Sequence, residues 1–486
     1  MSQILITDEF KEALDIMQNP RENCLFISGK AGTGKSTLLK EFISRKTNKK
    51  FAILAPTGIA AMNVRGSTIH SFFKFPPLYL GDIQSFYRKA PTLKVLRNLE
   101  MLIIDEISMV RVDLMDAIDR SLRQNRNENI PFGGVQIIFI GDLLQLPPVV
   151  GPEEKTKIKK QFSGEFFFDA PVMKEIQFKF VSLERIFRQD KKENDFKEAL
   201  NRIREKKHIN EDLHLINKNI LPLKKRLSWW KKIIAFLYKV FSLGKNDLFE
   251  KWSVVNENNI MKISPKNREV YDINRKNYVQ LNSKEYIFKA VITGKLKEDS
   301  FEWDKMTEQE QFLNLKNIVP APYILKVKEG AKIMMTNNDP NKRWVNGSLG
   351  EIIKITDEYL TVNLSGRIYE LQKEKFETAK YEWNDVIRDI EKKIESTYTQ
   401  FPIQLAWAIT IHKSQGLSFD KMILENSSKM FADGQLYVAL SRCRRLDTLY
   451  IRKPISSEEV MANERVIRFY KSLSKMGGKI KSISVF

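Results

Sequence analysis

Short apolar runs alternate with helix-like stretches along the first third of the chain, and each run ends at a residue that stops a strand. Phe51–Ala55, Met101–Ile104 and residues 135–140 have the length of buried strands, and Pro, Asp or Gly follows them directly. This alternation predicts an α/β fold with a parallel, doubly wound sheet. Because ligands of such sheets bind beyond the carboxyl ends of the strands, the residues after each run are expected to line a site.

A further apolar run, residues 25–27, leads into GKAGTGKS at positions 29–36, which fits the phosphate-binding pattern G-x-x-x-x-G-K-[ST]. A glycine-rich turn between a strand and a helix points backbone N–H groups and the positive end of the helix dipole at an anion. Lys35 is therefore expected to reach the terminal phosphates of a nucleoside triphosphate, and Ser36 to bind Mg²⁺. The flanking strand and helix disfavour the alternative, a glycine turn with an exposed lysine.

Polar side chains also follow two other strand candidates. Asp105 and Glu106 come after the run at 101–104, where one carboxylate can hold Mg²⁺ and the other can orient or deprotonate the attacking water. We assign Asp105 to the metal and Glu106 to the water. Gln145, in GDLLQLPP at 141–148, is the candidate sensor of the γ-phosphate. The alternatives are an acidic pair at a solvated turn and a plain strand and turn.

Two segments suit a phosphate-rich polymer. PTGIAA at 56–61 follows a strand and opens a helix, and GSTIHSFF at 66–73 supplies hydroxyls, an imidazole and aromatic rings. Hydroxyl groups and helix N-termini can hold a nucleic-acid backbone, and rings can stack on bases. The alternative for Phe72 and Phe73 is a place in the hydrophobic core.

A late segment carries a candidate arginine for the triphosphate. In DGQLYVALSRCRR at 433–445, Arg442 follows a helical apolar stripe made of Leu436, Ala439 and Leu440. An arginine in this place can project toward the triphosphate from another domain. The alternative is a charge on a helix surface.

Composition narrows the class of partner. The chain has 486 residues, enough for roughly three domains, and 81 Lys plus Arg against 60 Asp plus Glu give a net charge of +21. A charge of this sign favours a polyanion such as nucleic acid, and the alternative is a general lysine bias of the source proteome.

Cysteine and histidine usage and hydropathy disfavour disulfide-stabilised, zinc-binding, secreted and membrane-spanning proteins. Two cysteines and four scattered histidines suggest neither a disulfide scaffold nor a zinc site. The N-terminus lacks the pattern of a signal peptide, and no uncharged run of about 18 residues occurs, so we expect an intracellular protein without an integral membrane segment.

Taken together, GKAGTGKST, APTGIAA, GSTIHSFF, LIIDEISM, GDLLQLPPV, LERIFRQ, TIHKSQG and QLYVALSR resemble, in order, the motif series of superfamily 1B DNA helicases, specifically the PIF (petite integration frequency) family, relatives of RecD and Dda. The match runs from about residue 5 to residue 455. The resemblance implies an ATP- and Mg²⁺-dependent helicase that moves 5′ to 3′ on single-stranded DNA and unwinds forked duplexes or other DNA structures. It implies roles in replication, repair, recombination and telomere maintenance. The alternative is a DNA-stimulated translocase that strips proteins from DNA without unwinding.

The resemblance also carries roles onto single positions. It implies catalytic roles for Lys35, Glu106, Gln145, Arg188 and Arg442, with the two arginines as arginine fingers, and metal binding by Ser36 and Asp105. The nucleotide is expected to contact Gly29, Ala31, Gly32, Thr33, Gly34, Lys35, Ser36, Thr37, Gln145, Arg188, Gly416 and Arg442. DNA is expected to contact Pro56, Thr57, Gly58, Thr68, His70, Ser71, Phe72, Thr410, His412 and Lys413.

The implied architecture has two RecA-like P-loop domains, a wedge insertion and a Src-homology-type β-barrel. The first domain is expected at 1–200, with the wedge near 75–95, and the second at 256–327 and 401–460. The barrel is expected at 328–400, where short strands alternate with glycine turns, a helical insertion at 201–255 and a C-terminal tail at 461–486. We expect a monomeric motor, cytoplasmic if bacterial or from a phage and nuclear or mitochondrial if eukaryotic.

Two places depart from the family pattern. Phe10 stands where the family usually has a glutamine that reads the adenine ring, so selectivity for adenine is left open. The alternatives for Phe10 are stacking on a base and a place in the hydrophobic core. The second is the basic and apolar segment 221–244, which can pack on the second domain, contact a protein partner or DNA, or lie on a membrane surface.

Overall fold

The computed structural model describes residues 6–19, 23–45, 49–64, 66–76, 78–189, 193–221, 257, 260–294, 296–315, 319–337, 339–341, 343–344, 346–384, 389–475 and 479–480. Apart from Leu221, the expected insertion at 221–244 lies outside these residues.

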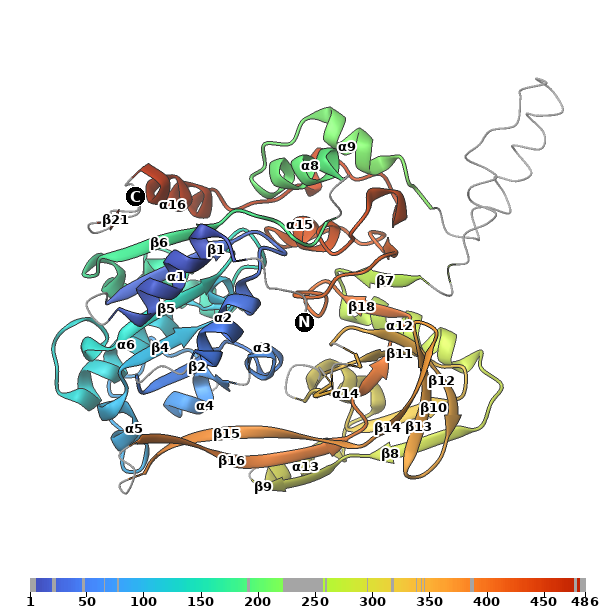
Figure 1. The fold of residues 1–486 in the computed structure, drawn as a ribbon, viewed down its shortest axis with the longest axis horizontal. Coiled ribbons are helices and arrows are strands. Elements are labelled where there is room, and N and C mark those ends of the chain that lie inside the picture. The colour runs from blue at the N-terminus through green and yellow to red at the C-terminus, as the bar shows by residue number, and fades with distance from the viewer. Residues whose placement is uncertain are drawn as a thin grey trace.

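The first domain is built on a seven-stranded sheet with the order β21-β6-β1-β5-β4-β2-β3 (Figure 1). The neighbouring strands are parallel except for β21 and β6. The predicted parallel sheet, with strands at 25–27, 51–55, 101–104 and 135–140, is therefore confirmed to within a few residues at the strand ends. The strands are β1 (Cys24–Gly29), β2 (Phe51–Ala55), β3 (Ser67–Thr68), β4 (Met101–Ile104), β5 (Gln136–Gly141), β6 (Phe178–Leu183) and β21 (Lys479–Ile480).

Helices cover both faces of this sheet. One face packs on α1 and α2 through residues such as Leu14, Leu38 and Ile103. The other packs on α4, α6 and α16. The helices of this domain are α1 (Asp8–Gln18), α2 (Lys35–Ser44), α3 (Gly58–Asn63), α4 (Ile69–Phe73), α5 (Thr92–Asn98), α6 (Val112–Arg126), α7 (Pro152–Gln161) and α16 (Glu464–Lys475).

The local sequence explains how α1 starts and which side it buries. The Thr7 side chain caps the helix by accepting a hydrogen bond from the Phe10 N–H at 3.4 Å, and Asp8 and Glu9 lie in the first turn, near the positive end of the helix dipole. Phe10, Leu14 and Met17 recur at helical spacing and are buried. This face packs the helix beside the phosphate-binding loop that follows β1.

A smaller sheet of four parallel strands, in the order β18-β7-β19-β20, forms the second domain. Its core also includes residues of α8, α9 and α15. The elements are β7 (Met261–Ser264), β18 (Ala408–Thr410), β19 (Met422–Leu424), β20 (Leu449–Ile451), α8 (Asn194–Arg204), α9 (Asn210–Asn217), α12 (Asn267–Val279) and α15 (Gln435–Leu440). The chain thus contains two parallel α/β sheets, as the resemblance implied.

Between α12 and β18 the chain forms antiparallel strands. A five-stranded sheet has the order β14-β13-β12-β11-β17, and two smaller sheets join β10 to β8 and β15 to β16 and β9. The elements are β8 (Glu285–Lys289), β9 (Val291–Gly294), α13 (Leu296–Trp303), α14 (Glu308–Leu315), β10 (Ile324–Lys328), β11 (Lys332–Met335), β12 (Leu349–Ile355), β13 (Tyr359–Leu364), β14 (Arg367–Gln372), β15 (Glu374–Asn384), β16 (Asp389–Gln400) and β17 (Ile403–Leu405).

The long hairpin β15–β16 extends across the molecule to the first domain (Figure 1). There β15 contacts α5, which ends the segment expected to form the wedge. The hairpin therefore links the antiparallel region to the first domain.

The arrangement differs from the expected boundaries in four places. The boundary at 200 falls inside α8, which packs with α9 on the second domain's core. Strands β8, β9 and β10 join the smaller antiparallel sheets instead of the four-stranded sheet, and β15 and β16 form the hairpin outside the five-stranded sheet. The segment expected as a tail contains α16, whose Val466, Phe469 and Leu473 lie in the first domain's core.

Candidate functional site

The phosphate-binding loop connects the end of β1 to the start of α2. Gly34 caps α2 with a φ of 93°, a left-handed conformation that favours glycine. Gly32 also has a positive φ, and a Cβ at this position would lie 2.4 Å from the Arg188 Cβ. Glycine at position 32 therefore lets a second segment of the chain approach the loop.

Lys35 points into this loop. Its Nζ donates hydrogen bonds to the carbonyl oxygens of Gly29 and Lys30, at 2.6 and 3.1 Å. Burial lowers the pKa of Lys35, because a low-dielectric site disfavours the charged ammonium. Asp142, Glu106 and Asp105 oppose this shift through their charges, so the ammonium is surrounded by the site's carboxylates.

The two predicted carboxylates lie directly after β4. Glu106 has a φ of 52°, and its backbone N–H donates to the Asp105 Oδ1 at 2.9 Å. Burial raises the pKa of Asp105. Burial, and after it the charge of Asp105, raises the pKa of Glu106 to about 7. A carboxylate with this pKa is suited to accept a proton near neutral pH.

Gln145 lies after β5, the strand that pairs with β4. Its Nε2 donates to the Asp142 Oδ2 at 3.1 Å. Gln415, from the second domain, donates through its Nε2 to the Gln145 Oε1 at 3.3 Å and to the Glu106 Oε2 at 3.2 Å. Sequence reasoning singled out TIHKSQG but gave Gln415 no role, and its place in that motif was the available signal.

The two predicted arginines meet at the same place. Arg188 donates through Nη2 to the Gly416 carbonyl at 3.2 Å, and burial lowers its pKa to about 10. Arg442 is buried and donates to the Val438 carbonyl at 2.7 Å and to the Ser441 Oγ at 2.7 Å. The alternative of a helix-surface charge at Arg442 is therefore wrong.

Lys35, Glu106, Gln145, Arg188 and Arg442 line one cavity of about 570 Å³. Every predicted nucleotide contact except Gly29, which forms the end of β1, lines it. The cavity has the size of a small-molecule site, and it lies where the two domains meet. Its lining is Thr7, Phe10, Ala31, Gly32, Thr33, Gly34, Lys35, Ser36, Thr37, Glu106, Gln145, Leu183, Glu184, Arg185, Phe187, Arg188, Gly416, Ser418 and Arg442.

The cavity's donors fit an anionic ligand. The Arg188 Nη1 is buried and has no hydrogen-bond partner among the described residues, and a buried charged donor without a partner is costly. Lys35, Arg188 and Arg442 bring three cationic groups to the cavity wall. A phosphate chain would satisfy these donors.

The residues expected to bind Mg²⁺ lie at the same end of the sheet. Ser36 lines the cavity, and Asp105 follows β4. Among the described residues, no group of three or more His, Cys, Asp and Glu side chains could hold a metal ion. A hydroxyl and a carboxylate suit Mg²⁺, which usually takes one or two protein carboxylates and completes its shell with phosphates and water.

A buried network supports the cavity from behind. Arg204, at the end of α8, pairs with Asp142 at 2.6 Å. The Tyr437 Oη accepts a hydrogen bond from the Ala31 N–H at 3.1 Å, and the Tyr470 Oη accepts one from the Leu143 N–H at 3.1 Å. Sequence reasoning missed Arg204 and Tyr470, which lie outside the quoted motifs, because their partners are far away along the chain.

The predicted DNA contacts of the first domain lie directly after β2 and at or after the end of β3. The Thr57 Oγ1 accepts from the Ala60 N–H at 3.2 Å, and the Thr68 Oγ1 accepts from the Ser71 N–H at 3.2 Å, so both hydroxyls cap helices. Pro56, Gly58 and His70 are half-buried. Burial, and after it the charge of Arg111, lowers the pKa of His70.

Phe72 and Phe73 lie in the core of the first domain, where their rings meet edge to face with centroids 5.0 Å apart. The expected stacking of Phe72 on bases is therefore wrong for this arrangement, since 6% of the residue is exposed. The core alternative is confirmed for both rings.

The predicted contacts of the second domain lie at the end of β18 and directly after it. The Thr410 Oγ1 accepts from the Lys413 N–H at 3.2 Å, and the Lys413 Nζ donates to the Gln404 Oε1 at 3.0 Å. His412 is half-buried. Lys413 is two residues from Gln415, so the predicted DNA contacts and the nucleotide cavity share one short loop.

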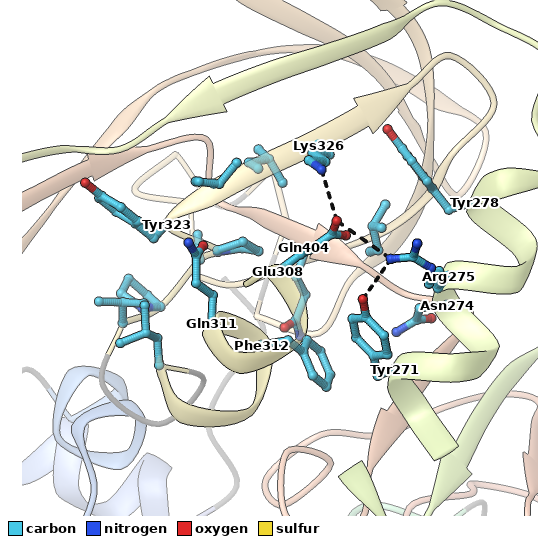
Figure 2. Close-up of a pocket in the computed structure, with 18 of the residues that line it drawn as sticks. Tyr271, Asn274, Arg275, Tyr278, Glu308, Gln311, Phe312, Tyr323, Lys326 and Gln404 are labelled. Carbon is cyan, nitrogen blue, oxygen red and sulfur yellow. Dashed lines mark hydrogen bonds and ion pairs between the residues drawn. The ribbon is translucent and has the colours of Figure 1, made fainter. Parts of the chain in front are cut away.

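Lys413 also lines a second cavity, of about 240 Å³, between α12, α14 and β10 (Figure 2). Glu308 bridges this space, with its Oε2 3.0 Å from the Lys326 Nζ and 3.9 Å from the Arg275 Nη1. Tyr271 and Phe312 form an aromatic wall, with ring centroids 5.5 Å apart. This cavity therefore lies on the seam between the second domain and the antiparallel region.

Within the described residues of the chain, no helix has the length and hydropathy needed to cross a membrane.

Comparisons with known proteins place these features in context. The family model of PIF1-like helicases matches residues 6–213. The chain is 31% identical to the ATP-dependent DNA helicase Pif1 of Campylobacter jejuni, over 92% of this chain and 94% of that protein.

Solved structures give the same likeness. The crystal structure of Bacteroides sp Pif1 in complex with ADP-AlF4 is 34% identical, with a TM-score of 0.81, and the alignment covers 98% of this chain and 99% of that one. Bacteroides Pif1 bound to ssDNA is 33% identical over the same shares of both chains, with a TM-score of 0.65.

Proposed function

Because the chain belongs to the family of PIF1-like helicases, we propose that it is an ATP-dependent DNA helicase whose motor is the cleft between its two parallel sheets. The observation that carries this proposal is the cavity of about 570 Å³, where Lys35 and Glu106 of the first domain meet Gly416 and Arg442 of the second. A nucleotide bound there touches both domains, so its hydrolysis changes how the two domains are positioned relative to each other.

We assign the binding of the phosphates to the first domain. The backbone N–H groups of Gly32 and of residues 34–36, together with the Lys35 ammonium, hold the β- and γ-phosphates. Lys35 is now hydrogen-bonded to Gly29 and Lys30, and it exchanges these carbonyl partners for phosphate oxygens when ATP binds. Ser36 and Asp105 would hold Mg²⁺, which neutralises charge on the phosphates when bound.

We assign proton transfer to Glu106. Its carboxylate accepts a proton from the attacking water and orients that water toward the γ-phosphate. Gln415 and Gln145 fix the carboxylate and sense the reacting phosphate. Arg188 and Arg442 stabilise the negative charge that develops during transfer.

Coupling to DNA runs through the loop after β18. Lys413 and Gln415 are two residues apart, and Gln415 contacts Glu106. We propose that Thr57, Thr68 and His70 on the first domain, and Thr410, His412 and Lys413 on the second, hold the backbone of a single strand. Closure of the cleft on ATP then shifts the grip between the two sets, and hydrolysis resets it.

We place the separation of the duplex at the segment 75–95. The Arg88 Nε donates to the Phe73 carbonyl at 2.8 Å, and Phe86 is buried in the first domain's core, which anchors this segment. The hairpin β15–β16 reaches α5 at its end. A braced segment of this kind can separate the strands of a duplex as the motor advances.

Movement in the family is 5′ to 3′, and we propose the same polarity and a role in DNA replication, repair and recombination for this chain. One experiment tests activity and polarity together. The protein and ATP are incubated with duplexes that carry only a 5′ or only a 3′ single-stranded tail. Strand release from the 5′-tailed duplex alone is expected, and release solely from the 3′-tailed duplex would contradict the proposal.

Two further measurements separate this function from two other classes of protein. DNA-stimulated ATP hydrolysis without strand release from a forked duplex would identify a translocase that strips proteins from DNA. Equal DNA release with ATP and with a non-hydrolysable analogue would identify an ATP-gated binding protein.

A further inference from the structure

An ion pair between the two domains is buried directly behind the nucleotide cavity. The Arg204 Nη2 lies 2.6 Å from the Asp142 Oδ1, and the Arg204 Nε lies 3.3 Å from the Asp142 Oδ2. The side chains are 8% and 0% exposed. Arg204 ends α8, which packs on the second domain, whereas Asp142 follows β5 of the first. The pair therefore fixes the end of one domain's strand against the other domain's helix.

The pair is held in a polar and aromatic frame. The Arg204 guanidinium lies over the Tyr470 ring, 5.4 Å from its centroid. The Tyr470 Oη contacts the Ser28 Oγ at 2.6 Å and accepts from the Leu143 N–H at 3.1 Å. Tyr470 belongs to α16, so the returning C-terminal helix and α8 meet at Asp142. Burial acts to raise the pKa of Asp142, and Arg204 outweighs it, so this pKa is lowered and the carboxylate stays charged.

Asp142 determines how Gln145 is oriented. The Asp142 Oδ2 accepts a hydrogen bond from the Gln145 Nε2 at 3.1 Å. An ionised carboxylate only accepts hydrogen bonds, so the NH₂ group of Gln145 must face it. The Gln145 Oε1 then faces the cleft, where it accepts from Gln415, the residue that also donates to Glu106.

From this relay we propose that Arg204 is a positioning residue for ATP hydrolysis, which acts through Asp142 to hold Gln145 and, through Gln415, Glu106 in their reactive orientation. The inference rests on the proposed function and adds a residue from outside the cavity, since Arg204 does not line it. The guanidinium reaches both carboxylate oxygens through Nε and Nη2, a geometry that a lysine ammonium cannot reproduce.

The test uses the full chain and variants of one helix. Arg204→Lys keeps the charge and loses the two-point contact. Arg202→Lys is the matched control, because Arg202 lies on α8 and pairs with Asp212 and Glu198 away from the cavity. ATP hydrolysis is measured at saturating single-stranded oligonucleotide, and the melting temperature by circular dichroism shows whether each variant is folded.

The expected result is a fall in kcat of about 10- to 100-fold for Arg204→Lys, with KM for ATP within about threefold of wild type. Arg202→Lys is expected to keep wild-type kcat. A folded Arg204→Lys variant with wild-type kcat would overturn the inference.

A double-mutant cycle distinguishes positioning from a purely structural role. If Arg204 acts through Gln145, Arg204→Lys lowers kcat no further in a Gln145→Ala background. Independent, multiplicative losses would overturn the inference. The pair Arg204→Met with Asp142→Leu gives a second check, because it removes both buried charges together. We expect its melting temperature to recover relative to Arg204→Met alone while kcat stays low, and recovery of kcat with the melting temperature would also overturn it.

Failure of this inference is separable from failure of the proposed function. If wild-type protein hydrolyses ATP and separates strands while Arg204→Lys does the same, only the role of Arg204 is lost. If wild-type protein does neither, the proposed function itself is wrong.

Discussion

Each of the two α/β sheets of this molecule has an inner strand that leads into a helix, and the two sheets differ in the turn that joins this strand to its helix. In the first, β1 lies between β5 and β6 and leads into α2; in the second, β7 lies between β18 and β19 and leads into α12. The first connection contains Gly32 and Gly34 with positive φ. In the second, the Ser264 Oγ donates to Glu269 and accepts from the Lys266 N–H at 3.2 Å, so its own side chains fill the turn.

This difference between the two turns implies different roles for the two sheets in the site. A glycine turn leaves backbone N–H groups open to an anion, whereas the turn after β7 is closed by internal hydrogen bonds. We therefore expect the first sheet to hold the nucleotide and the second to contribute groups that sense it, such as Gln415 and Arg442. Substitutions in the two domains are therefore expected to change ATP hydrolysis by different amounts.

The largest effect on ATP hydrolysis is expected at Arg188, which lies between the phosphate-binding loop and the second domain. Arg188→Ala keeps the Cβ that contacts Gly32 but removes the guanidinium that reaches Gly416 and the cavity. An arginine that stabilises transferring phosphate contributes about 10³-fold or more to kcat, and we expect a loss of this size in steady-state ATP hydrolysis. Arg188→Lys should recover some of it. Wild-type turnover in Arg188→Ala would remove Arg188 from the reaction.

A somewhat smaller loss is expected on the first-sheet side. Glu106→Gln keeps the shape of the side chain but cannot accept a proton, so kcat should fall about 10²- to 10³-fold. Binding of a fluorescent ATP analogue should stay within a few-fold of wild type. Glu100→Gln, on the exposed residue before β4, is the control and should turn over normally. Loss of nucleotide binding in Glu106→Gln, with turnover of the bound fraction intact, would contradict the assignment.

The smallest effect is expected at Phe10, which stands where the family usually has its adenine-reading glutamine. Phe10 lines the cavity beside Thr7 and offers no hydrogen-bonding group to a base. Phe10→Gln adds a donor and an acceptor, and one net hydrogen bond of about 1 kcal/mol corresponds to roughly fivefold. We expect the ratio of kcat/KM for ATP to that for GTP to rise by about this factor, while Phe10→Leu leaves the ratio unchanged. An unchanged ratio in Phe10→Gln would show that Phe10 lies away from the base.

Sequence reasoning worked best where the chemistry is local. The glycine loop at 29–36 and the carboxylates after β4 lie at strand ends that apolar runs mark, and the structure places them in or beside one cavity. It failed where the interacting residue is distant. Arg204 meets Asp142 across 62 residues, and Tyr470 meets Ser28 across 442, so neither spacing nor periodicity indicated these contacts.

The same limit explains the errors in layout. The strand periodicity of the antiparallel region is visible in the sequence, but the pairing of its strands is not, so the hairpin β15–β16 was expected in the barrel. Apolar residues of α16 recur at helical spacing, yet the sheet on which they pack lies more than 280 residues earlier. The ring of Phe72 suits stacking on a base and suits a core equally well, and only the packing of the first domain decides between them.

The comparison of the two turns gives the most direct test of the central claim, that the first sheet holds the nucleotide which drives the motor. Lys35→Ala and Lys266→Ala remove one lysine from each turn, and ATP hydrolysis without DNA is measured for both. The account predicts a loss of at least about 100-fold for Lys35→Ala and a rate within about twofold of wild type for Lys266→Ala. Equal rates in the two variants would contradict it.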